Sequence, residues 1–113
     1  MVGEDVGVKC TWLQADPQLS EMVFRYKEIS EYGPDLYKAL VEHCERLLYH
    51  VHNDSKTTRQ IHANRALVAA KSTATALCKM ASLHGSTRAS ELQRDVDELV
   101  ALCNNHLHNV MMA

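Results

Sequence analysis

Seven histidines and four cysteines are the residues of this 113-residue chain best suited to bind a metal or to react. Two histidine pairs have the form His-x-His: His50 with His52, and His106 with His108. Side chains two residues apart on a helix point in nearly opposite directions, so neither pair chelates one ion while it is helical. A protonated imidazole instead suits the negative end of a helix dipole, where both pairs and His84 are expected to lie. We therefore predict structural roles for the histidines and no metal site.

The cysteines give no sign of a zinc site or of a disulfide framework. No Cys-x-x-Cys pair, which structural zinc usually requires, occurs among Cys10, Cys44, Cys78 and Cys103. Three of the four fall on the apolar stripes of predicted helices, where a reduced thiol packs as a small hydrophobic side chain. Cys103 could share a helix face with His106, but two ligands do not make a site. We expect reduced core thiols, as in an intracellular protein.

Catalytic motifs are absent from the chain. Its four glycines are not spaced as a phosphate-binding loop, and neither Gly-x-Ser-x-Gly nor His-Glu-x-x-His occurs. The paired Glu-x-x-His motifs of di-iron helical bundles are missing too. Asp95, Asp97 and Glu98 cluster on the predicted solvent side of a helix, where carboxylates need no special role. We therefore predict no catalytic residues, no enzymatic activity and no cofactor.

His62 begins a segment that resembles a known functional motif. Histidine-containing phosphotransfer domains are four-helix bundles with the motif His-x-Leu-Lys-Gly-x-Ser on a core helix. Residues 62–68 here read His-Ala-Asn-Arg-Ala-Leu-Val. A basic residue, Arg65, lies three positions after the histidine, and a small residue lies four positions after the histidine. The leucine, glycine and serine are missing, and Arg replaces Lys. The resemblance implies an alternative function, in which His62 is a phosphoacceptor that relays phosphate.

Three strong breaks divide the chain into the elements that must position these residues. They lie at 32–35, 52–55 and 84–87, and each combines a helix stop with a helix start. Gly or Asn readily adopts the left-handed backbone conformation that ends many helices, and Asp, Ser or Pro suits the first turn of the next helix. Four amphipathic segments joined by such short links predict an all-α fold, an antiparallel up-down four-helix bundle.

The expected boundaries follow from these signals. Residues 1–15 form a short N-terminal arm whose Trp12 anchors against the bundle, and residues 16–113 form a single helical domain. Its helices are expected at 16–32, from the break at 32–35 to about 53, and at 55–83. The last helix begins between 86 and 90 and reaches 111. Ser90 with Gln93 fits a capping box at its start.

Heptad-like seams predict the core. Apolar residues repeat every three or four positions along the last three helices, which is typical of helices that cross at about 20°. The seam of the 55–83 helix is mostly alanine, so its neighbours should approach closely. The residues expected to be almost fully buried are Leu47, Leu67, Leu77, Leu99 and Cys103.

Charge narrows the choice of partners. The net charge of −2 provides no general attraction to nucleic acid, and the basic helix lacks aromatic side chains for stacking. No apolar run approaches the roughly 20 residues of a membrane span, and we expect residues 1–14 not to be a secretory signal because they contain two acids and no continuous apolar run. Residues 56–83 carry five basic residues and no acid, whereas acids are common in the first and last helices. Either the helices neutralise one another, or the basic face meets an acidic partner.

The 55–83 helix also has a second stripe, opposite its alanine seam. A helix with one buried face should be polar on its back, but here apolar and basic residues alternate. Such a surface would be satisfied by contact with the chain's own arm, with a second copy or with another protein. We call this set the outer stripe and predict that it binds a partner helix or a second copy: Ile61, Arg65, Val68, Ser72, Ala76, Lys79 and Leu83.

The predicted function is non-enzymatic. We expect a helical interaction module, or a small adaptor or structural subunit of an intracellular, cytoplasmic assembly. Its partner is a protein, helical or acidic, or a second copy of the chain. Two architectures fit: a bundle closed within one chain, or long helices that pair with partner helices, as in small coiled-coil subunits of trafficking or scaffold complexes.

Overall fold

Helices account for nearly all of the residues that the structure describes, 11–112. In this computed structural model the elements are α2 (Thr11–Gln14), α3 (Pro17–Arg25), the 3₁₀ helix η1 (Tyr26–Tyr32), α4 (Pro34–Asn53), α5 (Lys56–Leu83) and α6 (Arg88–Met112). No strand occurs among these residues, which confirms the predicted all-α class. No helix in the described range is both long and apolar enough to cross a membrane.

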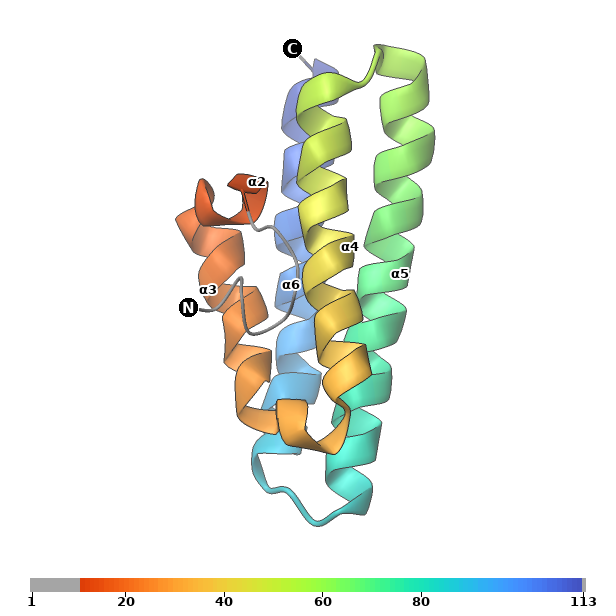
Figure 1. Ribbon diagram of the computed structural model, residues 1–113. Coiled ribbons are helices and arrows are strands. Elements are labelled where there is room, and N and C mark those ends of the chain that lie inside the picture. The colour runs from red at the N-terminus through yellow and green to blue at the C-terminus, as the bar shows by residue number, and fades with distance from the viewer. Residues whose placement is uncertain (1–10, 113) are drawn as a thin grey trace.

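The three long helices α4, α5 and α6 lie side by side along the molecule (Figure 1). The α4–α5 turn is at one end and the α5–α6 turn at the other, while α3 and η1 pack against α6 and α4 over part of that length. The helix α5 contacts α4, α6 and η1, but it contacts neither α2 nor α3. Among the elements of residues 11–112, none therefore covers one side of α5.

The first predicted helix is divided into α3 and η1. It begins as expected, because Asp16 caps α3 by accepting a hydrogen bond from the Leu19 N–H at 3.0 Å, and Pro17 occupies the first turn. At Tyr26 the helix tightens into η1. The hydroxyl of the buried Tyr26 donates to the Leu92 carbonyl at 2.8 Å and joins η1 to α6. The pattern of apolar residues did not reveal this change, because short 3₁₀ segments keep nearly the same spacing.

Part of the expected arm is helical. The backbone N–H groups of Trp12 and Leu13 in α2 donate to the two carboxylate oxygens of Glu45, at 2.7 and 2.9 Å, and Leu13 is fully buried. A carboxylate at this position satisfies N–H groups that a helix start leaves unpaired. Trp12 packs against the core, as predicted, and stacks on His52. Residues 1–10 of the arm, including Cys10, lie outside the described residues.

The core lies where the seams predicted it. The five residues expected to be buried are all buried, and the most exposed of them, Leu67, is only 7% exposed. Buried alanines line the inner side of α5, and this side packs against both α4 and α6. Cys44, Cys78 and Cys103 are free thiols buried in the same cluster.

The two turns at the ends of α5 differ in their backbone geometry. After α5 the chain turns as predicted: Gly85 has a φ of 84°, and the Ser86 N–H donates to the Ala81 carbonyl at 3.0 Å. At the other end, Asn53 stays helical and the chain reverses through Asp54 in an extended conformation, so no left-handed residue is used there. The capping box predicted at Ser90 is wrong, because α6 already begins at Arg88.

Candidate functional site

The outer stripe lies on the side of α5 that no other helix in the described part of the chain covers. Its three large apolar side chains are well exposed: Ile61 by 54%, Val68 by 60% and Leu83 by 74%. Arg65, Ser72 and Lys79 are exposed and Ala76 is partly buried. None of the seven residues of the stripe belongs to the core.

The stripe is continuous along the helix. From Ile61 to Leu83 its members follow one another at steps of three or four residues, over about 33 Å at 1.5 Å per residue. Along this line the apolar side chains of Ile61, Val68 and Leu83 are separated by polar and basic ones, so the stripe is a mixed apolar and basic surface. At one end, Lys79 and Leu83 also line a groove of about 450 Å³ between α5 and α6, with Ser90 and Gln93 on the other side.

Ion pairs show which basic residues neutralise acidic residues of α3, η1 and α6. Arg25 binds Glu21 at 3.3 Å, Asp95 at 3.5 Å and Glu98 at 3.8 Å. A second arginine, Arg88, lies 3.0 Å from Glu28 and also pairs with Glu91. These arginines belong to α3 and α6 themselves, so α5 is not what neutralises these acids.

Three basic residues of α5 correspondingly have no acidic partner among the described residues. Within the described part of the chain, Arg65, Lys71 and Lys79 form no ion pair. All three are exposed. Two of them, Arg65 and Lys79, belong to the outer stripe, which therefore presents positive charge beside apolar surface.

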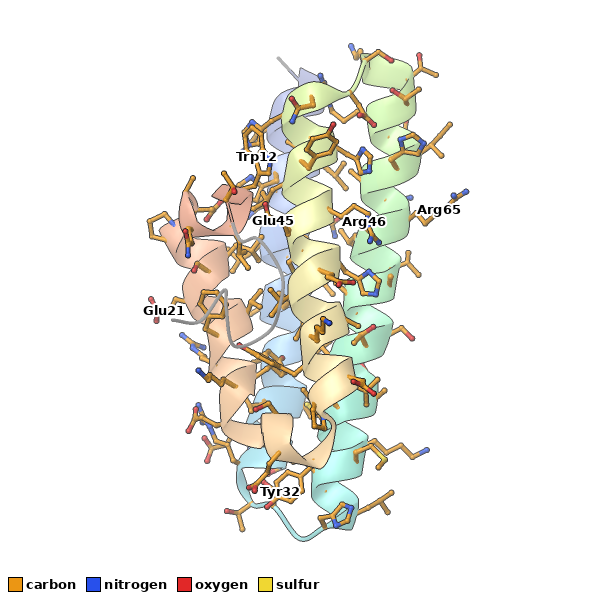
Figure 2. All side chains as sticks on the ribbon, in the orientation of Figure 1. Trp12, Glu21, Tyr32, Glu45, Arg46 and Arg65 are labelled. Atoms are coloured by element: carbon orange, nitrogen blue, oxygen red, sulfur yellow. The ribbon has the colours of Figure 1, made fainter. Side chains whose placement is uncertain are left out.

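A second candidate site lies between α4 and α5, near the turn that joins them. A pocket of about 470 Å³ is lined by His43, Arg46, His50, His62, Arg65, Ala66 and Ala69. The side chains labelled in Figure 2 include Arg46, on α4, and Arg65, which extends from the outer side of α5. Arg65 belongs both to this pocket and to the outer stripe, so the two candidate sites adjoin.

Asp54 joins two histidines at the edge of this pocket. Its Oδ2 atom lies 2.9 Å from Nδ1 of His50 and 2.8 Å from Nδ1 of His62, so one carboxylate oxygen serves two rings. The ring centroids are 4.7 Å apart. The Asp54 backbone carbonyl accepts a hydrogen bond from Nη2 of Arg59 at 2.9 Å, which fixes the turn that carries the carboxylate. We call these three residues, His50, Asp54 and His62, the turn cluster.

Electrostatics in the pocket follow from these contacts. The hydrogen bond from His50, supported by the one from His62, holds the pKa of Asp54 below its usual range against the opposing effect of partial burial. Burial lowers the pKa of His43, and the Arg46 guanidinium lowers it further. His43 is therefore a neutral imidazole near pH 7, and its Nδ1 atom is buried without a hydrogen-bond partner.

The turn cluster was not predicted from the sequence. In the sequence, His50 pairs with His52, His62 stands alone as the alternative phosphoacceptor, and Asp54 marks only the turn. In the structure His52 stacks on Trp12, and His106 forms an ion pair with Asp16. The side chains of His50 and His52 therefore contact different partners. The signal that could have found the cluster is the spacing His-x₃-Asp-x₇-His, read together with a tight turn that folds α5 back onto α4.

Comparisons of this chain with protein-family models, curated proteins and solved structures found no match. The fold and the two sites therefore define it only as an all-helical protein that has an apolar and basic outer stripe next to a histidine-rich pocket.

Proposed function

We propose that this chain is a non-enzymatic helical interaction module, a small adaptor or structural subunit of an intracellular assembly, and that it binds its partner through the outer stripe. The observation that carries the proposal is the uncovered face of α5, where well-exposed Ile61, Val68 and Leu83 alternate with unpaired basic residues. The alanine seam already provides α5 with a buried face, so folding does not require an apolar outer face.

The chemistry of the stripe favours an acidic amphipathic helix as the partner. Apolar side chains spaced along one face of α5 would pack against the apolar face of a second helix. Arg65 and Lys79 would meet its flanking carboxylates, which speeds encounter and fixes register more than it adds affinity. Two α5 helices placed face to face would bring like charges together, which disfavours a symmetric α5–α5 dimer.

We also infer that the module is an up-down four-helix bundle closed within one chain, with α3 and η1 together as its first helix. Two features support this arrangement. The links between successive long helices are short, and the shared core includes residues from α3, η1, α4, α5 and α6. Figure 1 shows the chain travelling along the molecule in α4, back in α5 and along it again in α6.

The test combines Arg65→Glu with Val68→Glu in one variant. It should lose the partners that the parent chain retains in a pull-down analysed by mass spectrometry. The reason is that Val68→Glu places a charge in the interface, and Arg65→Glu replaces a positive charge of the stripe with a negative one. Its helical circular dichroism signal should stay unchanged, since both positions are exposed. A matched control is Arg94→Glu with Ala101→Glu, which makes the same change in net charge at exposed positions of α6.

Each result bears on the proposal. Loss of partners in the α5 variant and retention in the α6 control supports the outer stripe as the interface. If the folded α5 variant keeps every partner of the parent, the interface lies elsewhere. If the α6 control loses them equally, general charge and not the stripe governs binding.

A second candidate function is phosphate relay through His62. The specific observation in its favour is the surroundings of this residue. Its side chain is 44% exposed, its Nδ1 atom is hydrogen-bonded to Asp54, and two arginines line the same pocket. The Nε2 atom is the one that would accept a phosphoryl group, with Arg46 or Arg65 as a counter-charge.

Radiolabelled acetyl phosphate provides a direct test of this alternative. The parent chain should acquire an acid-labile label, which His62→Gln removes and His84→Gln retains. His84 is a suitable control because it is exposed and lies at the far end of α5. Absence of label in the parent, or label that persists in His62→Gln, rules the relay out.

A further inference from the structure

The turn cluster brings three metal-ligating side chains from two helices to one point. One ring nitrogen of His50, one ring nitrogen of His62 and a carboxylate oxygen of Asp54 all lie within 4.8 Å of one another. His50 lies in the last turn of α4, Asp54 directly follows that helix, and His62 lies in the second turn of α5. The short turn between the helices is therefore what assembles the set.

The geometry of the cluster is close to that of a coordination sphere. Zinc binds imidazole nitrogen and carboxylate oxygen at about 2.0–2.2 Å, so neighbouring ligand atoms around a tetrahedral ion are about 3.3 Å apart. The two nitrogen–oxygen distances here are 2.9 and 2.8 Å. An outward movement of about half an ångström per pair would admit the ion. Each ring would also move its proton from Nδ1 to Nε2, which neutral imidazole does by exchange with water.

The surroundings of the cluster suit a bound ion in two respects. The turn that carries the carboxylate is held by the hydrogen bond from Arg59 to the Asp54 carbonyl, at 2.9 Å, so that ligand is already positioned. The site is also reachable, because the His62 side chain is 44% exposed while those of His50 and Asp54 are only 19% and 15% exposed. An ion could enter from solvent on the His62 side and meet two fixed ligands.

We propose that His50, Asp54 and His62 form a binding site for one divalent transition-metal ion, zinc by the chemistry of its ligands. Two imidazoles and one carboxylate are a ligand set that zinc accepts, whereas magnesium and calcium prefer oxygen alone. Three protein ligands leave a fourth position for water or an anionic group. None of the three ligands belongs to the outer stripe, and a bound ion would link α4 to α5 beside the turn that joins them.

Zinc binding should be measured on the full untagged chain, stripped with a chelator and kept in a phosphine reductant. Isothermal titration should show one ion per chain. Cobalt substituted for zinc should give the visible bands of a tetrahedral site without a thiolate charge-transfer band, which separates this cluster from the cysteines.

Variants then assign the ligands. Asp54→Asn keeps an oxygen that accepts the histidine hydrogen bonds but removes the anionic ligand, so a purely structural cluster would tolerate it. We expect Asp54→Asn and His50→Gln each to weaken zinc binding by more than about 100-fold, since loss even of groups that only orient ligands costs 10–100-fold. The control His84→Gln should bind zinc as the parent does.

Several outcomes would overturn the site. They are less than one zinc ion per chain in the parent, equal affinity in Asp54→Asn and parent, or a thiolate band in the cobalt spectrum. Failure of His50→Gln to fold would leave Asp54→Asn as the deciding variant. None of these outcomes affects the proposed partner-binding stripe, whose test does not depend on metal.

Discussion

A single oxygen atom of Asp54 accepts hydrogen bonds from two histidines, His50 and His62, which lie twelve residues apart in the chain and on different helices. This contact arises only because Asp54 and Ser55 are both extended, so that α5 starts directly beside the end of α4. Neither histidine nor the acid stands out in the sequence, since each residue type is common near helix ends. The outer stripe, by contrast, could be predicted, because it depends on the periodicity of one helix alone.

The contact has a measurable consequence for the titration of Asp54. Its hydrogen bonds lower the folded-state pKa, so its midpoint, followed by NMR of the carboxyl carbon, should fall below the usual value of about 3.9. The associated stabilisation is present above the unfolded pKa and is lost as the pH falls through the folded pKa. The variant His50→Gln should raise the midpoint, and His84→Gln should not. An identical midpoint in parent and His50→Gln would contradict the arrangement.

At the scale of elements, the long helices were easier to predict than the short ones. The ends of α4 at Asn53 and α5 at Leu83 fell where the break signals put them, because a stop and a start coincide at each place. The short helix α2 was missed because it is stabilised from outside, by the distant Glu45 carboxylate. A four-residue helix has no periodicity of its own from which it could be inferred.

The alanine seam of α5 makes a second prediction. Ala74 is fully buried and lies on the side of α5 that faces its neighbours. A larger side chain there would push α4 and α6 away from α5, so Ala74→Leu should lower the free energy of unfolding by about 1–3 kcal/mol in a urea titration. The adjacent Thr75→Leu is the matched control, because Thr75 is exposed and the same residue there should change stability little. Equal effects of the two variants would show that the seam is not tightly packed.

At the scale of the whole molecule, the described residues bury their apolar side chains in one shared cluster. That cluster draws on α2, α3, η1, α4, α5 and α6, and no long helix is left without a packed inner face. The sequence alone left two architectures open, because heptad-like seams suit a closed bundle and an intermolecular coiled coil equally. Which helices meet depends on the lengths and geometry of the turns, and spacing along one helix does not contain that information.

The proposed closure of the bundle within one chain predicts the state of the isolated chain. Because the seams are satisfied internally and the exposed face of α5 is basic along its length, the chain should sediment as a monomer in the absence of a partner. Analytical ultracentrifugation over a range of concentrations measures this directly. A concentration-dependent dimer in the parent that Arg65→Glu with Val68→Glu abolishes would instead identify a second copy of the chain as the partner.

The docking of α2 supplies the molecule with an optical reporter of its own. The chain has one tryptophan, and Trp12 stacks on His52 at a centroid distance of 5.0 Å while the Glu45 carboxylate holds the backbone beside it. Release of α2 would carry that indole into water and shift its emission to longer wavelength, without loss of the long helices. Fluorescence and circular dichroism recorded on one sample therefore separate detachment of this short segment from unfolding of the remainder, with no label added.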